Sequence, residues 1–132
     1  MSRRLTFVAP PPGFAPEVNF ALSAVDGADG LYSLASEQPS GDSGSLRLFV
    51  LDAAVYLPSY SPEISDDQRR QLDLADAAEA LVLIVANSTE AGTTVNLLAP
   101  VIVNTRTLRC AQVILEGQNW PVRVPLEAAA AA

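Results

Sequence analysis

The sequence predicts a mainly all-β protein, a small antiparallel β-barrel-like domain with one or two short helices. About eight short stretches alternate apolar and polar residues with the two-residue period of a half-buried strand. Proline, glycine and small polar residues separate these stretches, and only one stretch carries a clear helix start. The chain has 132 residues, of which 49% are hydrophobic and 17% charged. A chain of this length and composition can bury one core.

Four strands are expected in the first half of the chain. Leu5 and Phe7 alternate with polar neighbours, and the prolines that follow end this strand because proline cannot donate to a hydrogen-bonded ladder. Phe14 comes after those prolines and is expected to plug the end of the barrel. Residues 37–44 combine polar residues with proline and glycine, which indicates a loop. The four strands are expected at residues 3–9, 18–25, 31–36 and 45–52.

The middle of the chain is expected to hold the helix. Residues 53–62 contain prolines and aromatic residues without a regular period and are expected to be irregular. Ser65 lies three positions before Gln68, which is the spacing of a capping box. Acidic residues follow the serine directly, where the helix dipole favours negative charge. We therefore expect a helix from the Ser65 cap to residue 74, with a second helical turn possible at residues 75–79.

Four more β segments are expected in the second half. The first is apolar on both faces, as is typical of a central strand. The last is an edge strand in which Trp120, Val122 and Val124 share the inward face, with prolines that blunt the edge. These segments are expected at residues 80–87, 93–104, 109–115 and 120–124.

Residues 93–115 carry the densest β-forming pattern and are expected to form a meander of strands. Pro100 is expected to interrupt it, because proline has no amide hydrogen for the ladder. Asn96, Asn104 and Gln112 are the polar members of this meander. We expect their side chains to bond buried backbone groups at irregularities around the proline.

Charge and residue types exclude several functions. The formal net charge is −7 and the pI about 4.3, which opposes binding to nucleic acid phosphates and suits a basic partner. The chain has no histidine, and its one cysteine, Cys110, is expected to be a buried and inert thiol. No cofactor or metal site is therefore expected. Asp66 and Asp67 are adjacent on a helix and point in different directions, so no catalytic carboxylate pair and no enzymatic activity are expected.

No apolar run approaches the roughly 20 residues of a membrane span, and no secretory signal is recognised. The expected protein is cytoplasmic, does not contact a membrane and is monomeric when free.

Several motifs together resemble one protein family. Residues 94–104 (TVNLLAPVIVN), followed by residues 112–115 (QVIL), closely resemble the signature of the bacterial flagellar assembly factor FliW family. One departure is that Asp73 stands where that family commonly has glycine. The resemblance covers residues 5–126, so a single domain at residues 1–126 and an alanine-rich tail at residues 127–132 are expected. Shorter motifs that also resemble the family lie at residues 12–14 (PGF), 57–60 (LPSY), 72–74 (LDL) and 122–126 (VRVPL).

The resemblance implies a function by binding. Members of the family bind CsrA, a small basic RNA-binding protein that blocks translation of flagellin messenger RNA, at a site distinct from its RNA surface. Flagellin competes for the family member, which couples flagellin synthesis to assembly. The partners implied here are thus CsrA and flagellin. The residues assigned to protein binding are an aromatic and apolar loop with nearby carboxylates, namely Tyr56, Leu57, Tyr60, Glu63, Asp66 and Asp67.

Other interpretations remain open at this stage. Tyr60 also fits a core lid whose hydroxyl bonds a backbone group, which is the more frequent role of such a tyrosine, and the carboxylates fit a solvated helical face. The whole chain fits a small barrel that binds an apolar ligand in its mouth. It also fits a dedicated flagellin chaperone without CsrA antagonism.

Overall fold

A computed structural model gives the fold of nine segments of the chain, and the expected plug Phe14, loop 37–44 and tail 127–132 lie outside them. Those three expectations stay predictions. The described residues are 2–9, 18–27, 29–36, 47–57, 60, 62–75, 79–90, 92–115 and 117–126.

Eight strands and two short helices make up the described chain. The strands are β1 (Ser2–Phe7), β2 (Asn19–Ala24), β3 (Leu31–Ser36), β4 (Arg47–Asp52), β5 (Ala80–Thr89), β6 (Gly92–Asn104), β7 (Arg109–Gln112) and β8 (Val124–Pro125). The helices are α1 (Ala53–Tyr56) and α2 (Asp66–Gln71).

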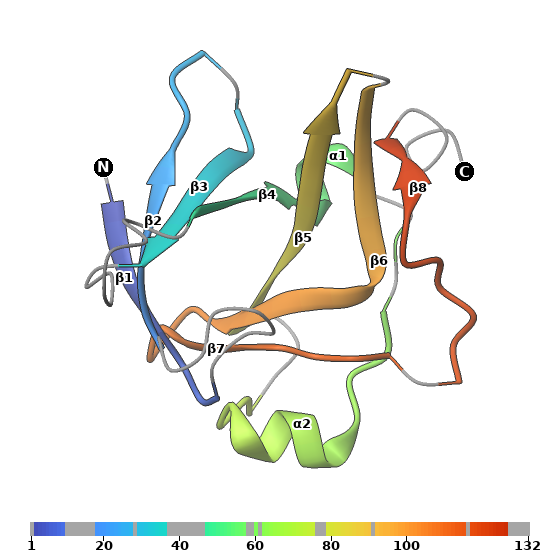
Figure 1. The fold of residues 1–132 in the computed structure, drawn as a ribbon. Coiled ribbons are helices and arrows are strands. Elements are labelled where there is room, and N and C mark those ends of the chain that lie inside the picture. Colours follow the sequence, from blue (N-terminus) through green and yellow to red (C-terminus); the bar gives the residue numbers. More distant parts are fainter. Residues whose placement is uncertain are drawn as a thin grey trace.

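The sheet closes into a barrel. Its strands run in the order β5-β4-β3-β2-β1-β7-β6-β8, and β5 also pairs with β6. Strands β1 to β7 therefore form a closed seven-stranded barrel, and β8 lies outside it on β6 (Figure 1). The predicted fold class is confirmed.

One strand pair of the described barrel is parallel rather than antiparallel. β1 pairs with β7 through Thr6 with Arg109 and Phe7 with Cys110. Neighbouring strands of the barrel follow one another along the chain, and each reverses direction. An odd number of such strands cannot close with antiparallel pairs alone, so the closing pair must be parallel. Seven strands rather than eight in the barrel thus explain this departure from an all-antiparallel expectation.

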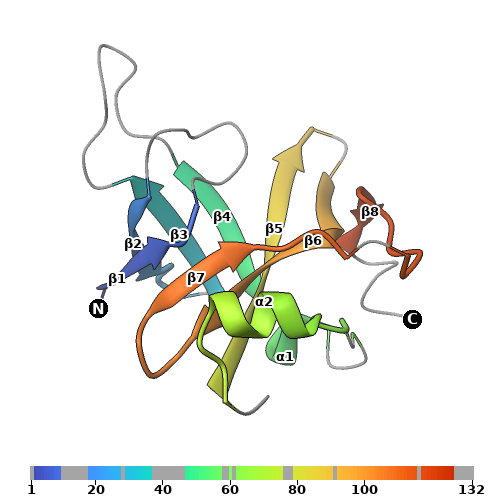
Figure 2. The same ribbon diagram turned by 90° about the horizontal axis from the view of Figure 1, so that it is seen from below.

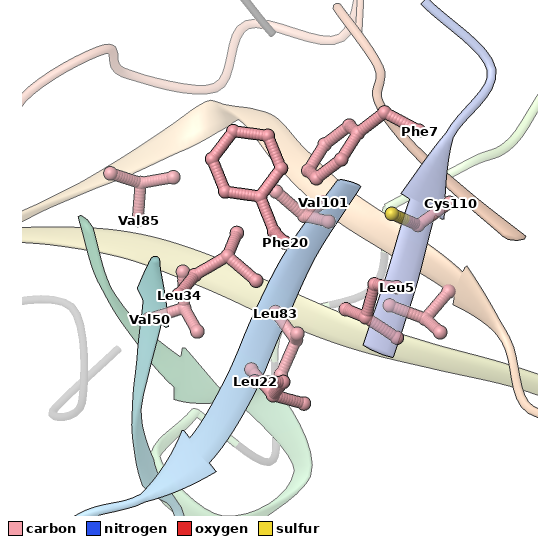
Figure 3. Packing of buried hydrophobic residues seen from close by; sticks show 11 residues of the cluster. Leu5, Phe7, Phe20, Leu22, Leu34, Val50, Leu83, Val85, Val101 and Cys110 are labelled. Atoms are coloured by element: carbon pink, nitrogen blue, oxygen red, sulfur yellow. The ribbon is translucent and has the colours of Figure 1, made fainter. Parts of the chain in front are cut away.

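The barrel interior is filled by side chains from every one of its strands (Figure 3). Phe7 and Phe20 meet edge to face near one end, with ring centroids 5.2 Å apart. Such contacts add to the stabilisation from burial alone. The buried members of this interior cluster are Leu5, Phe7, Phe20, Leu22, Leu34, Val50, Leu83, Val85, Val101, Val103 and Cys110.

Two further apolar clusters lie on the outside of the barrel, which explains why β5 and β6 are apolar on both faces. One cluster includes residues of α1 and packs against β8, and the other includes Leu72 and Leu74 after α2. Figure 2 shows both helices on the outside of the barrel. The first cluster contains Leu51, Ala53, Leu57, Ile84, Ala86, Val95 and Leu97. The second contains Leu72, Leu74, Ile102, Ala111, Val113 and Leu115.

The expectation of an irregular segment from residue 53 was wrong for its first residues. α1 starts directly after β4, and the side chain of Asp52 caps it by accepting a hydrogen bond from the amide of Ala54 at 3.0 Å. A helix of four residues shows no measurable apolar period, so only the aspartate cap could have announced it.

α2 begins as predicted and ends earlier. The Gln68 amide donates to Ser65 Oγ at 3.1 Å, and the Ser65 amide donates to Gln68 Oε1 at 2.9 Å, which completes the capping box. The helix stops at Gln71 because Asp73 has a φ of +53°. This left-handed conformation suits glycine best and is tolerated by aspartate. Residues 76–78 lie outside the described chain, so a second helical turn at residues 75–79 stays a prediction.

The last strands differ from expectation in detail. β6 continues through Pro100 instead of splitting there, and β7 ends at Gln112 rather than at residue 115. β8 has only two residues. Val122 was expected to face inward, but 58% of its surface is exposed, because the chain bends at residues 122–123 before β8 begins.

Candidate protein-binding surface

The signature motif forms a bulge in β6. Leu83 of β5 pairs with Val101, and Val85 pairs with Asn96, so residues 97–100 bulge out opposite Ile84. The bulge turns β6 away from β5 towards the segments that follow β7 and precede β8. Proline is tolerated at such a place because the ladder is already interrupted.

The side chains of Asn96 and Gln112 satisfy backbone groups of this bulge. Asn96 Oδ1 accepts from the amides of Leu98 and Ala99 at 3.0 and 3.1 Å. Gln112 Nε2 donates to the Ala99 carbonyl at 3.1 Å. The Pro100 carbonyl accepts from the Val113 amide at 2.9 Å. Buried backbone groups must find partners, and this requirement gives both polar side chains a structural role.

Tyr60 closes the bulge from the outside. Its hydroxyl donates to the Leu97 carbonyl at 2.5 Å. Its ring meets Trp120 edge to face with centroids 4.7 Å apart, and it packs against both outer clusters. Burial raises the pKa of the Tyr60 hydroxyl well above its ordinary value. The lid with a bonded hydroxyl, one of the two interpretations left open by the sequence, is the arrangement that the structure shows.

Asn104 is fully buried and joins α2 to the turn after β6. Its Nδ2 donates to the carbonyls of Leu72 and Asp73 at 2.8 and 3.1 Å. Its Oδ1 accepts from the amides of Arg106 and Thr107 at 2.8 and 3.2 Å. All the hydrogen-bonding capacity of this amide is used inside the fold, so the side chain is not available to a partner.

The carboxylates proposed for binding lie on the exposed side of α2 and just before it. Glu63, Asp66 and Asp67 are exposed, and we call these three residues the acidic edge. Gln118 holds the backbone of Glu63 at two points, accepting from its amide at 2.9 Å and donating to its carbonyl at 2.8 Å. Asp67 forms an ion pair with Arg70 on the same helix, so part of its charge is already neutralised.

Two further carboxylates near α2, Asp73 and Glu79, already form ion pairs and are therefore less available to a binding partner. Arg106 pairs with Asp73 at 3.1 Å and with Glu79 at 2.9 Å. These two carboxylates bond Arg106 and raise the pKa of its guanidinium. By contrast, Glu63 and Asp66 of the acidic edge have no ion-pair partner in the described part of the chain.

The apolar part of the predicted site is only partly exposed. Leu57 is 3% exposed in the outer cluster under α1, so the expectation of an exposed apolar contact there was wrong. Tyr56 is half-buried against the same cluster. Leu57 directly follows α1, a helix too short to be recognised from the sequence. Nothing in the local sequence therefore indicated that this leucine is buried.

Sequence reasoning missed two features of this surface. Gln118 pairs with the backbone of Glu63 across a separation in the chain that no local pattern reveals. Ile114 is 53% exposed, and its carbonyl accepts a 3.5 Å hydrogen bond from Gln68 Nε2 of α2. An exposed isoleucine therefore lies beside α2.

No group of three or more histidine, cysteine or carboxylate side chains that could hold a metal occurs among the residues with described positions. In the same residues no helix is long and apolar enough to cross a membrane. Nothing in this geometry indicates catalysis.

Part of the chain is similar in sequence to known flagellar assembly factors. The chain is 29% identical over 84 residues to the flagellar assembly factor FliW of Syntrophus aciditrophicus, and this match covers 62% of the chain and 53% of that relative. It is 33% identical over 86 residues to the factor of Geotalea uraniireducens, again covering 53% of the relative. A match to the factor of Geobacillus kaustophilus, 29% identical, covers 85% of the chain and 76% of the relative.

The match to the first two relatives thus spans about half of their length. A crystal structure of the flagellar assembly factor FliW superposes with a TM-score of 0.80 and 24% identity, over 93% of this chain and 84% of that one, which shows the shared fold. The sequence model of the FliW protein family matches residues 1–126. The chain therefore belongs to the FliW family of flagellar assembly factors.

Proposed function

We propose that this protein acts in the cytoplasm as a flagellar assembly factor that binds and antagonises CsrA and also binds flagellin. Membership of the FliW family, over residues 1–126, is the observation that carries the proposal. CsrA antagonism without competition for RNA, and the coupling of flagellin synthesis to assembly, follow from what the family resemblance implies.

The charge of the chain supports a basic partner. Its 15 carboxylates exceed its 8 arginines, which gives a net charge of −7. Such a field attracts a basic protein over distances near the Debye length, about 8 Å at physiological salt. The same field repels RNA phosphates, so the protein alone should not bind RNA.

The acidic edge with Ile114 is the part of the described surface that best fits such a contact. Two carboxylates there have no ion-pair partner in the described chain, and the exposed isoleucine lies next to α2. Charges at the rim of an interface mainly raise the association rate, while apolar contacts slow dissociation. Gln118 fixes the backbone at Glu63, so little ordering is needed when a partner binds.

The experiment is a kinetic binding series with purified CsrA and flagellin from the same organism, and with flagellin leader RNA as a third analyte. We expect both proteins to bind and the RNA to bind only through CsrA. Binding of flagellin without CsrA would favour a dedicated flagellin chaperone. Binding of neither protein would overturn the proposal.

A triple variant tests the acidic edge itself. Glu63→Gln, Asp66→Asn and Asp67→Asn together should lower the association rate of CsrA roughly as added salt does, with little change in the dissociation rate. Three exposed carboxylates at the hairpin ends provide a control with the same change in net charge. If the control variant slows association equally, only net charge matters and the edge is not the contact. The control substitutions are Asp26→Asn, Asp29→Asn and Glu90→Gln.

A further inference from the structure

One mouth of the barrel is hollow. A cavity of about 320 Å³ opens there, at the lower end of the roughly 300 to 1,000 Å³ that is usual for ligand pockets. Its floor is formed by Leu5, Leu22 and Val103, which belong to the interior cluster. Figure 3 shows Leu5 and Leu22 on the side of that cluster away from Phe7 and Phe20. The phenylalanines fill the interior beyond the floor, so the hollow is confined to one end.

The walls of this mouth are also mainly apolar. Tyr32, Leu81 and Leu108 line the cavity and pack, half-buried, against the interior cluster. Leu108 holds a left-handed backbone with a φ of +64°, which is costly for a leucine. The turn before β7 thus keeps an apolar side chain at the mouth despite the strain.

A cation stands at the rim. Side chains alternate across a strand, and Arg3 shares its face of β1 with Leu5 and Phe7, so it belongs to the inward set. Arg4 belongs to the outward set. Arg3 also lines the cavity and pairs in register with Leu22 of β2. In the described chain it forms no ion pair.

Apolar walls and one unpaired cation select a particular kind of ligand. An uncharged apolar molecule would gain nothing from the exposed guanidinium, which stays hydrated, whereas a multiply charged molecule would bring unpaired charge onto leucine side chains. The net charge of −7 does not exclude an anion, because charges beyond about 8 Å are screened at physiological salt and Arg3 lies at the site itself.

We propose that this mouth binds one small amphipathic carboxylate, with its apolar tail on the floor and its carboxylate on the guanidinium of Arg3. The site is separate from the acidic edge, and the proposal does not depend on which proteins the chain binds. The sequence left open a barrel that binds a ligand in its mouth, and this proposal assigns such binding to this end of the molecule.

Octanoate is the probe, titrated into the full chain and followed by amide chemical shifts in nuclear magnetic resonance. A ligand of this size should bind with a dissociation constant on the order of 0.1 to 1 mM. The largest shifts are expected at the floor and walls of the mouth. Absence of saturable shifts there up to 10 times that concentration would overturn the proposal.

Matched variants separate the role of the cation from that of general charge. Arg3→Gln should weaken octanoate binding about fivefold, because the exposed guanidinium is partly screened. Arg4→Gln makes the same charge change on the outward face and should leave binding unchanged. Octanol, which keeps the tail and lacks the carboxylate, should bind the wild type and Arg3→Gln equally.

A substitution at Ala24 can close the entrance of the cavity without changing a core residue. Ala24 lies exposed at the rim, and Ala24→Phe should fill the entrance and reduce the affinity for both octanoate and octanol. Equal losses of octanoate affinity in Arg3→Gln and Arg4→Gln would contradict the proposed site. Unchanged octanoate affinity in Ala24→Phe would contradict it as well. Tighter binding of a peptide with an apolar C-terminal residue than of octanoate would also overturn the choice of a free carboxylate.

Discussion

Substitution of Tyr60 distinguishes a structural lid from an exposed interaction residue. Tyr60→Phe removes only the hydroxyl that donates to the Leu97 carbonyl at 2.5 Å. Tyr60→Ala removes in addition the ring that meets Trp120 and joins the two outer clusters. An exposed interaction residue would instead lose partner affinity with little effect on folding.

The structure sets the expected magnitudes. A neutral hydrogen bond contributes about 0.5 to 1.5 kcal/mol, and the upper part of that range applies to Tyr60→Phe because the Leu97 carbonyl of the bulge is left without this partner. Replacing a fully buried aromatic residue by alanine lowers the free energy of unfolding by about 3 to 5 kcal/mol. Tyr60 is half-buried, so Tyr60→Ala should cost about 2 to 3 kcal/mol. That is a large share of the roughly 5 to 15 kcal/mol that stabilise a small domain.

Urea unfolding followed by tryptophan fluorescence measures both losses, since Trp120 is the one tryptophan of the chain and lies against the Tyr60 ring. A pH series adds a second measurement. Burial raises the pKa of Tyr60 above its ordinary value of 10.0. The folded state therefore favours the protonated phenol, and this contribution to stability is complete below pH 10 and is lost as the pH rises further. Tyr60→Phe should reduce the loss of stability above pH 10.

Two outcomes would refute this reasoning. Equal stability of Tyr60→Phe and the wild type at neutral pH would mean that the hydroxyl contributes nothing to the fold. Unchanged unfolding of Tyr60→Ala together with a large loss of affinity for CsrA or flagellin would return Tyr60 to a binding interface.

Three further outcomes are expected. Asn104→Ala should cost about 2 to 4 kcal/mol in urea unfolding, because it removes four side-chain hydrogen bonds to the backbone, one of them buried and three partly buried, whereas a cost below 1 kcal/mol would show that water replaces the amide. Cys110 is fully buried, and burial raises the pKa of its thiol to about 12, so the folded protein should resist alkylation at pH 8 and react only when unfolded; fast alkylation of the native state would contradict its burial. Raising the salt concentration should slow CsrA association while leaving dissociation nearly constant, and complete loss of the complex at moderate salt would indicate a purely electrostatic contact.

Local patterns in the sequence predicted much of this fold. The alternation along β1 and β2 reflects strands with one face in the barrel, and the capping box at Ser65 is complete in the structure. The bonds of Asn96 and Gln112 to backbone near Pro100 could also be expected, since a proline interrupts the ladder and leaves neighbouring backbone amides and carbonyls that need other partners. These features depend on neighbours along the chain, and such neighbours are visible in the sequence.

Tertiary structure alone decided the candidate site. Leu57 looks the same in sequence whether a loop exposes it or an outer cluster buries it, and Gln118 meets Glu63 only after β6 and β7 have brought distant segments together. The parallel closing pair follows from the number of strands that close the barrel, and the hollow mouth at Arg3 is lined by residues that lie far apart in the chain. Exposure, pairing and cavities are properties of contacts between distant residues. The sequence by itself therefore determined the strands, the α2 cap and the family, while the closed barrel decided which side chains remain free to bind.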